Sequence, residues 1–211
     1  MAASWGLLTA VVSALMFGAN AAKGDWKLEY PPWGEPNTPT SGSPQIWVPL
    51  LGPFTGHGCF PSRYLSMRAA FSHLNRRDAS FCPAIATLKN KFEMTYDIAD
   101  SNSNGIETAR SALKFLNNRS RKVNVVLGPN GSGSSMSLSN LLAVFGIAHI
   151  SWASTSAKLS DKIAYPMFFR VVAPDSLTMR VLAGWLDHLK FKEINMVVFD
   201  APYQLGQLNH E

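Results

Sequence analysis

The segment that most constrains the fold of this chain runs from residue 123 to residue 151. It opens with a mostly apolar run, continues into a turn rich in glycine, asparagine and serine, and ends in a second apolar run at residues 147–151. Between the turn and the second run, large apolar residues recur at helical spacing, namely Leu138, Leu141, Leu142 and Phe145. The order of strand, polar turn, helix and strand predicts two parallel strands joined by a right-handed helical crossover.

Polar residues follow each of these two predicted strands. The first group lies in the turn and includes Ser132, and the second is the run Ser154, Thr155 and Ser156. Because the carboxyl ends of parallel strands meet at one edge of a sheet, both groups are expected to line the crevice where such sheets bind ligands. The first group also begins a helix, whose free N–H groups favour an anion. The sequence therefore predicts a site for a ligand that carries a negative charge.

Strands and helices alternate through the rest of the expected core, which places the chain in the α/β class. One parallel sheet flanked by helices is predicted from the apolar runs at residues 46–51, 92–98, 123–127 and 148–151. The helix predicted at residues 61–75 has an apolar face made of Tyr64, Met67, Phe71 and Leu74. A second helix is marked by Ile106, Ala109, Leu113 and Leu116.

The pattern changes after Ser151. Residues 168–172 predict a further strand. A helix is then expected to begin near Asp175, which follows Pro174, with an apolar face made of Leu182, Trp185, Leu186 and Leu189. Residues 194–199 predict one more strand. This last unit is too small to bury a core by itself. We therefore expect residues 46–172 to form a first lobe and residues 173–211 to begin a second lobe whose remainder is missing, so that the chain is a fragment.

The N-terminal residues are typical of an export signal followed by a linker. The apolar run at residues 7–17 is too short to span a membrane, and small residues occupy cleavage-like positions at residues 19–21. Residues 1–22 are therefore expected to be a signal peptide, and the alternative is a buried N-terminal helix, because no Lys or Arg precedes Trp5. Residues 23–45 are rich in proline and lack periodicity, which predicts a linker.

Export would place the chain in an oxidising compartment. There, Cys59 and Cys82 are expected to form one loop-closing disulfide. Asn118, which begins an Asn-Arg-Ser sequence, becomes a candidate glycosylation site. Asn130 begins a similar sequence, but a glycan at that position would occupy the predicted crevice.

Charge distribution and motifs argue against nucleic-acid binding and against catalysis. The formal net charge of the 211 residues is +5, but the Lys and Arg residues are scattered, which is typical of solvated helix ends. The turn at residues 128–135 lacks the ending of a phosphate loop and the pattern of a nucleophile elbow. His, Cys and carboxylate residues show no metal-ligand spacing. We expect no enzymatic activity, no cofactor and no metal ion.

Residues 128–175 resemble the extracellular ligand-binding domain of class C G-protein-coupled receptors, which include the metabotropic glutamate and GABA-B receptors. The resemblance rests on Gly128-Pro129, Ser132, Asp175 and the runs at residues 150–156, 159–162, 165–166 and 168–172. Residues 67–78 look more like the GABA-B branch, whereas residues 150–161 look more like the glutamate branch. The resemblance covers residues 46–203 and implies a periplasmic-binding-protein type I fold, the Venus flytrap, with an amino-acid-like ligand between two lobes.

The resemblance also implies roles for individual residues. Ser132 and Thr155 would hold the α-carboxylate and amine of the ligand. Asp175 and Tyr203 would take the ammonium group from the second lobe. Ala153, which stands where some members carry Ser, would contact the ligand only through its backbone.

Three departures from the family pattern qualify this assignment. Trp152 replaces the usual Tyr and would pack against the ligand or in the core. Ser66 occupies the position of a basic residue for the distal carboxylate of glutamate, so glutamate specificity is unsupported. Residues 100–104 lack a cysteine that many relatives have, which leaves Cys59 to pair with Cys82.

The implied partners follow from the family. A class C receptor acts as a dimer at the cell membrane, with its ligand-binding region on the extracellular side, and couples to a G protein through a membrane domain that this sequence lacks. Natriuretic-peptide-type guanylyl cyclase receptors and bacterial amino-acid binding proteins share the lobe architecture and are the alternatives.

Overall fold

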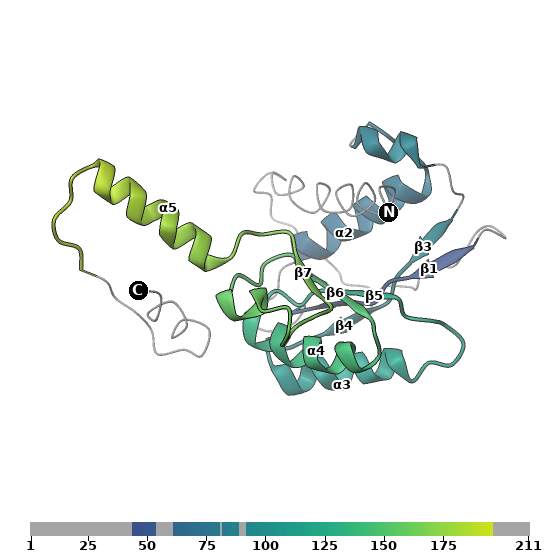
Figure 1. Ribbon diagram of the computed structural model, residues 1–211. Helices are drawn as coiled ribbons and strands as arrows, with labels where there is room; N and C mark the ends of the chain where they lie inside the picture. Colours follow the sequence, from purple (N-terminus) through teal and green to yellow (C-terminus); the bar gives the residue numbers. More distant parts are fainter. Residues whose placement is uncertain (1–43, 54–60, 81, 89–91, 196–211) are drawn as a thin grey trace.

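The computed structural model describes residues 44–53, 61–80, 82–88 and 92–195, and it shows a parallel sheet between helices (Figure 1). Within these residues, five strands are hydrogen-bonded in the order β4, β2, β5, β6, β7, and each pairing is parallel. They are β2 (Leu50–Gly52), β4 (Ile98–Asp100), β5 (Val125–Leu127), β6 (Ala148–Ser151) and β7 (Phe168–Arg170). The predicted α/β class and the parallel sheet flanked by helices are confirmed, although β1 and β3 form a separate two-stranded sheet.

Two of the predicted strands are interrupted, so the expectation of continuous strands at residues 46–51 and 92–98 was wrong. β1 (Gln45–Trp47) pairs with β3 (Glu93–Thr95) in the register that also pairs β2 with β4, so each pair continues beyond its break. The first break contains Pro49, whose nitrogen has no hydrogen to donate. Its carbonyl still accepts from Leu127 N at 3.0 Å, which keeps the proline within the sheet.

Helices cover both faces of the sheet and create two cores. α2 (Pro61–Asn75) lies on one face, and α3 (Gly105–Leu116) and α4 (Ser132–Val144) lie side by side on the other (Figure 1). The core under α2 includes Val48, Leu50, Met67, Phe71, Leu74 and Leu127. The core under α3 and α4 includes Trp47, Leu51, Ala112, Val126, Leu138 and Leu142. Adjacent residues of β2 and of β5 thus face opposite cores, as the pleat of a strand requires.

The buried face of α3 differs from the predicted one. Ile106 and Leu113 are exposed, and the helix buries Thr108, Ser111 and Ala112 instead. Small residues are needed because α3 and α4 approach closely: a Cβ added to Gly105 would lie 2.5 Å from Ser137 Oγ. Phe145, predicted to be on the apolar face of α4, is also exposed. In α3, close packing against α4, and not the spacing of large apolar residues, decides which face is buried.

Asn75, the last residue of α2, closes the free edge of β3. Its Nδ2 donates to Met94 O at 2.9 Å, and its Oδ1 accepts from Met94 N at 2.8 Å. One side chain thus makes the two hydrogen bonds that a neighbouring strand would make, and it blocks an edge that could otherwise pair with another chain. The 3-10 helix η2 (Pro83–Thr87) lies in the connection between α2 and β3.

Replacing Asn75 with alanine is expected to lower the free energy of unfolding by about 1–3 kcal/mol, because two backbone groups of the buried Met94 lose their partner. Urea denaturation measures the loss, and Asn124→Ala, at an exposed asparagine, is the control. Equal midpoints for the two variants would contradict this role of Asn75.

The last described helix, α5 (Asp175–His188), extends away from the sheet (Figure 1), and none of its residues is buried. Leu182, Trp185 and Leu189, predicted to share an apolar face, are exposed. No described helix has both the length and the apolar character needed to cross a membrane. The signal peptide, most of the linker and most of the strand predicted at residues 194–199 lie outside the described residues, so the domain boundaries stay predictions.

Candidate ligand-binding site

The carboxyl edge of the sheet contains a point where the chain changes its direction across the sheet. From β2 the chain moves to β4 on one side, and it then returns past β2 to β5 on the other side. Open parallel sheets bind ligands outside the carboxyl ends of the strands at such a point, which here lies between β2 and β5. Residues 54–60, which follow β2, lie outside the described residues. The described part of the site consists of the turns after β5, β6 and β7.

Gly128 begins the turn after β5 at a position that excludes any side chain. Its φ is +81°, and an added Cβ would lie 1.8 Å from Leu51 O. The ring of Trp152, which follows β6, would come within 2.4 Å of the same Cβ. The turn therefore passes directly between the end of β2 and the indole of Trp152.

The N-terminus of α4 follows this turn, and no side chain caps it. Gly131 occupies the N-cap position, where it has no hydroxyl or amide group that could accept a hydrogen bond from the helix. Ser132 is the first helical residue, so the alternative reading of Ser132 as a cap is wrong. The first N–H groups of α4 form the type of site that binds a carboxylate or another anion.

Ser132 connects the two polar groups that the sequence placed at this edge. Its Oγ accepts a hydrogen bond from Ser156 N at 3.2 Å, so the turns after β5 and β6 touch. Because the hydroxyl uses an oxygen lone pair in this bond, its own hydrogen remains free to donate to a ligand. Ser132 is half-buried at the point of contact.

Below this contact lies a buried network of hydroxyl groups that the sequence analysis missed. Ser154 Oγ lies 2.7 Å from Ser135 Oγ and 2.9 Å from Ser151 Oγ. All three serines are fully buried. Their spacing in a serine-rich segment gives no signal that separates them from exposed serines, because their burial depends on the packing of α4 on β6.

Thr155 and Asp175 meet through their backbones. Asp175 N donates to Thr155 O at 2.8 Å, which fixes the start of α5 to the turn after β6. The N-cap of α5 is Pro174 and no side chain caps the helix, so the alternative reading of Asp175 as a cap is also wrong. Asp175 lies in the first turn, where the helix dipole favours a carboxylate. Ser132, Thr155 and Asp175 are therefore brought to one edge.

Arg170, at the end of β7, holds the turn that contains Thr155. Its Nη1 donates to Ser156 O at 2.8 Å and to Ser154 O at 3.3 Å, and its Nη2 donates to Ser160 Oγ in the 3-10 helix η3 (Ala157–Ser160). Burial lowers the pKa of Arg170, whereas the carboxylate of Asp175 raises it. The sequence analysis included Arg170 only in the run at residues 168–172 that carries the family resemblance, and it assigned this residue no role.

A family model described as a receptor family ligand binding region matches residues 62–209. The match includes α2, the turns after β5, β6 and β7, and α5. The chain belongs to this receptor family. Its parallel sheet flanked by helices is the periplasmic-binding-protein-like lobe that the sequence predicted, and its function is to bind a ligand.

The remaining predicted contacts of this receptor-family lobe have mixed outcomes. Trp152 packs over Gly128 and against the core under α2, and its Nε1 is buried without a partner among the described residues. Ala153 is half-buried beside Ser154. Tyr203 lies outside the described residues. The second-lobe part of the predicted ammonium site is therefore represented by Asp175 alone.

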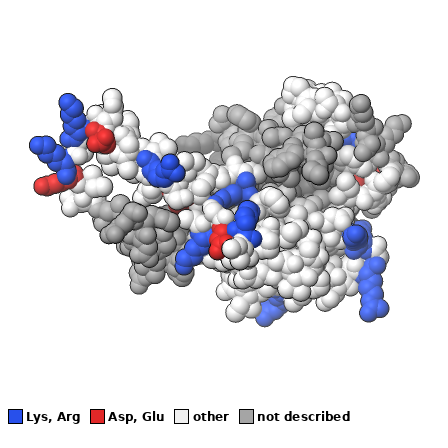
Figure 2. Space-filling view, in the orientation of Figure 1, with Lys and Arg blue, Asp and Glu red and all other residues white. Residues whose placement is uncertain are grey.

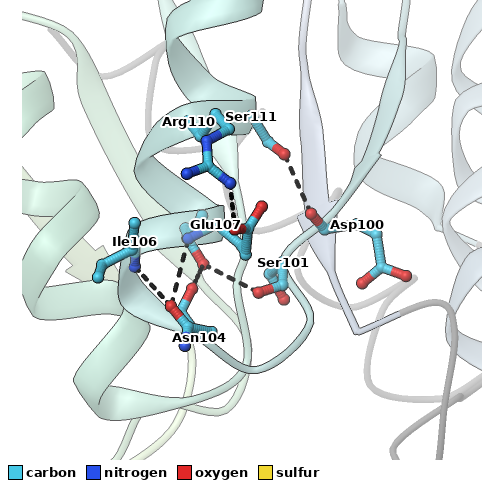
Figure 3. Close-up of polar contacts among 8 residues, drawn as sticks. Asp100, Ser101, Asn104, Ile106, Glu107, Arg110 and Ser111 are labelled. Atoms are coloured by element: carbon cyan, nitrogen blue, oxygen red, sulfur yellow. Dashed lines mark hydrogen bonds and ion pairs between the residues drawn. The ribbon is translucent and has the colours of Figure 1, made fainter.

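The second helix N-terminus on the same face of the sheet is closed, in contrast to α4. Asn104 caps α3 and accepts from Ile106 N at 2.8 Å and from Glu107 N at 3.3 Å (Figure 3). Later in α3, Ser111 Oγ donates to the O atom of Asp100, the last residue of β4, at 3.1 Å (Figure 3). Because its first N–H groups are already used, α3 offers less to an anion than α4 does.

The disulfide and the glycosylation site expected for this receptor-family protein stay predictions. Cys82 is buried with a free thiol, and Cys59 lies outside the described residues. Asn118 is exposed in the turn after α3, where its Oδ1 accepts from Ser120 N at 3.0 Å and from Ser120 Oγ at 2.6 Å. Asn130 is half-buried in the site.

Charged side chains do not form a site of their own in the described part of the chain. Figure 2 shows Lys and Arg in several separate groups on the visible face, with acidic residues beside some of them. Among the described residues, no three or more His, Cys, Asp or Glu side chains come together in a way that could hold a metal ion. The site of the receptor family member is thus built from hydroxyl groups, helix amides and one carboxylate.

Proposed function

We propose that this chain is part of the extracellular ligand-binding region of a class C G-protein-coupled receptor, and that it binds an amino-acid-like ligand between two lobes. The observation that carries the proposal is the uncapped N-terminus of α4, where Ser132 is held by Ser156 N with its own hydroxyl hydrogen free. This arrangement suits a carboxylate because helix amides and a hydroxyl group donate to it together.

The amine of the ligand would be received from the other side. Asp175 supplies a carboxylate at the start of α5, and its backbone bond to Thr155 O keeps that carboxylate beside the first-lobe turn. An ammonium group bound between Thr155 and Asp175, with Tyr203 closing over it, would link the two lobes. Lobe closure would then be favoured by the ligand, because only the closed form makes both sets of contacts.

The proposal also covers the location, the oligomeric state and the signalling of the region. The region acts on the extracellular side of the cell membrane, as a receptor dimer, and signals to a G protein through a membrane domain. It works by binding and closure, without catalysis.

Ser132→Ala is expected to weaken binding of the tightest ligand in a panel of free amino acids about tenfold to a hundredfold, because one charge-assisted hydrogen bond of about 1.5–3 kcal/mol is lost. Thr155→Ala is expected to weaken it as well. The measurement is isothermal titration of the complete ectodomain. Ser137→Ala is the matched control, since it removes an exposed hydroxyl from the same helix, one that bonds Gly133 O within α4 and not the turn after β6.

Unchanged affinity in both Ser132→Ala and Thr155→Ala, in folded protein, would show that the crevice assignment is wrong. Binding of a peptide hormone in place of every amino acid tested would favour a receptor of the guanylyl cyclase type.

A further inference from the structure

His149 is a buried titratable residue in β6 that the proposed contacts with the ligand do not use. Its side chain is 0% exposed. His149 Nδ1 lies 2.6 Å from Ser139 Oγ in α4, and His149 Nε2 lies 2.7 Å from Gly128 O in the turn after β5. One imidazole therefore connects β6, the ligand-binding turn and the middle of α4.

The hydrogen-bond partners fix the form of the ring. Gly128 O can only accept, so Nε2 carries the hydrogen and donates it. Nδ1 of the neutral ring then accepts from the hydroxyl of Ser139. Burial lowers the pKa of His149 to about 4, and the hydrogen bond to Gly128 O only partly offsets this, so the ring is neutral at pH 7.

The bond to Gly128 is one of a series. Gly128 O accepts from His149 Nε2, Pro129 O accepts from Ser151 Oγ at 2.6 Å, and Asn130 O accepts from Ser154 Oγ at 3.2 Å. Three consecutive carbonyl groups of the turn are thus held by side chains from β6 and the turn that follows it. Gly128 N, in addition, donates to Ile150 O at 2.8 Å.

We infer that His149 is a positioning residue of the ligand-binding turn, which holds the Gly128 carbonyl and α4 in the arrangement that presents the first amides of α4 to the ligand. This inference rests on the proposed function for its effect on affinity. Because the carbonyl groups of the turn are hydrogen-bonded to β6 and the turn after it, the backbone that leads into α4 has one conformation. The first amides of α4 therefore keep one orientation towards the ligand. Without the imidazole, α4 and the turn lose their shared anchor.

The test compares two substitutions of His149 in the complete ectodomain. His149→Phe keeps a ring of similar size against Phe168, whose ring lies 5.1 Å from that of His149, but it removes both hydrogen bonds. His149→Gln keeps a donor for Gly128 O. With the tightest amino acid of the panel as probe, we expect His149→Phe to bind at least about tenfold more weakly and His149→Gln to recover to within about threefold of the original affinity.

Asn75→Ala is the control for a loss of stability that is remote from the site, because Asn75 bonds to β3. If His149 has a purely structural role, Asn75→Ala should bind as weakly as His149→Phe, or His149→Gln should bind as weakly as His149→Phe. Either result overturns the inference. Unchanged affinity in folded His149→Phe overturns it too. If His149→Phe does not fold, Ser139→Ala takes its place, with an expected loss of about threefold.

Hydrogen exchange separates a failure of this inference from a failure of the proposed function. In ligand-free protein, His149→Phe is expected to speed exchange at the amides of residues 128–135 selectively, and His149→Gln is expected to restore them. If no amino acid binds the original protein, the proposed function fails, while the exchange pattern still supports or overturns the positioning role. Exchange that increases uniformly, or does not change at residues 128–135, overturns it.

Discussion

Gly128→Ala is expected to lower the free energy of unfolding by more than about 3 kcal/mol, which is among the largest effects of a single methyl group. Two costs combine at this position. The φ of +81° is unfavourable for any residue with a Cβ, and the added Cβ would lie 1.8 Å from the backbone oxygen of Leu51. Neither β2 nor the turn can move away easily, because Gly128 N is bound to Ile150 O and Gly128 O to His149.

Gly146→Ala separates these two costs. Gly146 has a φ of +65°, but an added Cβ there meets nothing within 4 Å. We expect it to lose only about 1 kcal/mol, from backbone strain alone. Urea denaturation of both variants gives the comparison, and similar losses in the two would mean that the close approach of the turn to β2 is not part of the fold in solution.

The second large effect is acid sensitivity that depends on His149. Its pKa is lowered to about 4 in the folded protein, against an ordinary value of 6.5, so the unfolded chain takes up a proton at a pH where the folded protein does not. Stability from this group is complete above about pH 6.5, and it is lost progressively as the pH falls towards 4. The difference corresponds to about 3 kcal/mol at and below pH 4.

Among the described residues, no opposite charge contributes to the pKa of His149, which is set by burial and by the hydrogen bond to Gly128 O. Ser139 faces it from α4, the Gly128 carbonyl from the turn, and Phe168 from β7. On the Phe168 ring lie the side chains of Lys162 and Arg170, which are both positive. Unfolding free energies of the original protein and of His149→Gln, measured from pH 7 to pH 4, should diverge by this amount. Parallel curves would contradict the prediction.

Much of the fold could be predicted because local sequence patterns agreed with the tertiary structure. Short apolar runs ended by glycine or polar residues gave the strands, and Met67, Phe71 and Leu74 gave the buried face of α2. The α3 face was mispredicted because its burial depends on small residues that fit against α4. The break at Pro49 was visible in the sequence, but the register that continues past it depends on pairing with residues far along the chain.

The candidate site was predicted in part. Ser132, Thr155 and Asp175 follow strand ends or begin helices, so their shared edge could be inferred from the order of elements. Arg170 and His149 could not be assigned roles from sequence, because their partners are backbone carbonyl groups that become neighbours only when β5, β6 and β7 align. The sequence also could not show that α4 lacks a side-chain cap, because the N-cap residue, Gly131, is identified only by its backbone conformation.

The central claim is that the carboxylate of the ligand is bound by the first amides of α4, and amide chemical shifts test it most directly. In a titration of the ¹⁵N-labelled ectodomain with the tightest amino acid of the panel, the largest shifts are expected at Ser132, Gly133 and Ser134. The amides of Ile106 and Glu107, already bound by the Asn104 cap, serve as an internal control and should move little. Saturable shifts elsewhere, with residues 132–134 unmoved, would contradict the claim.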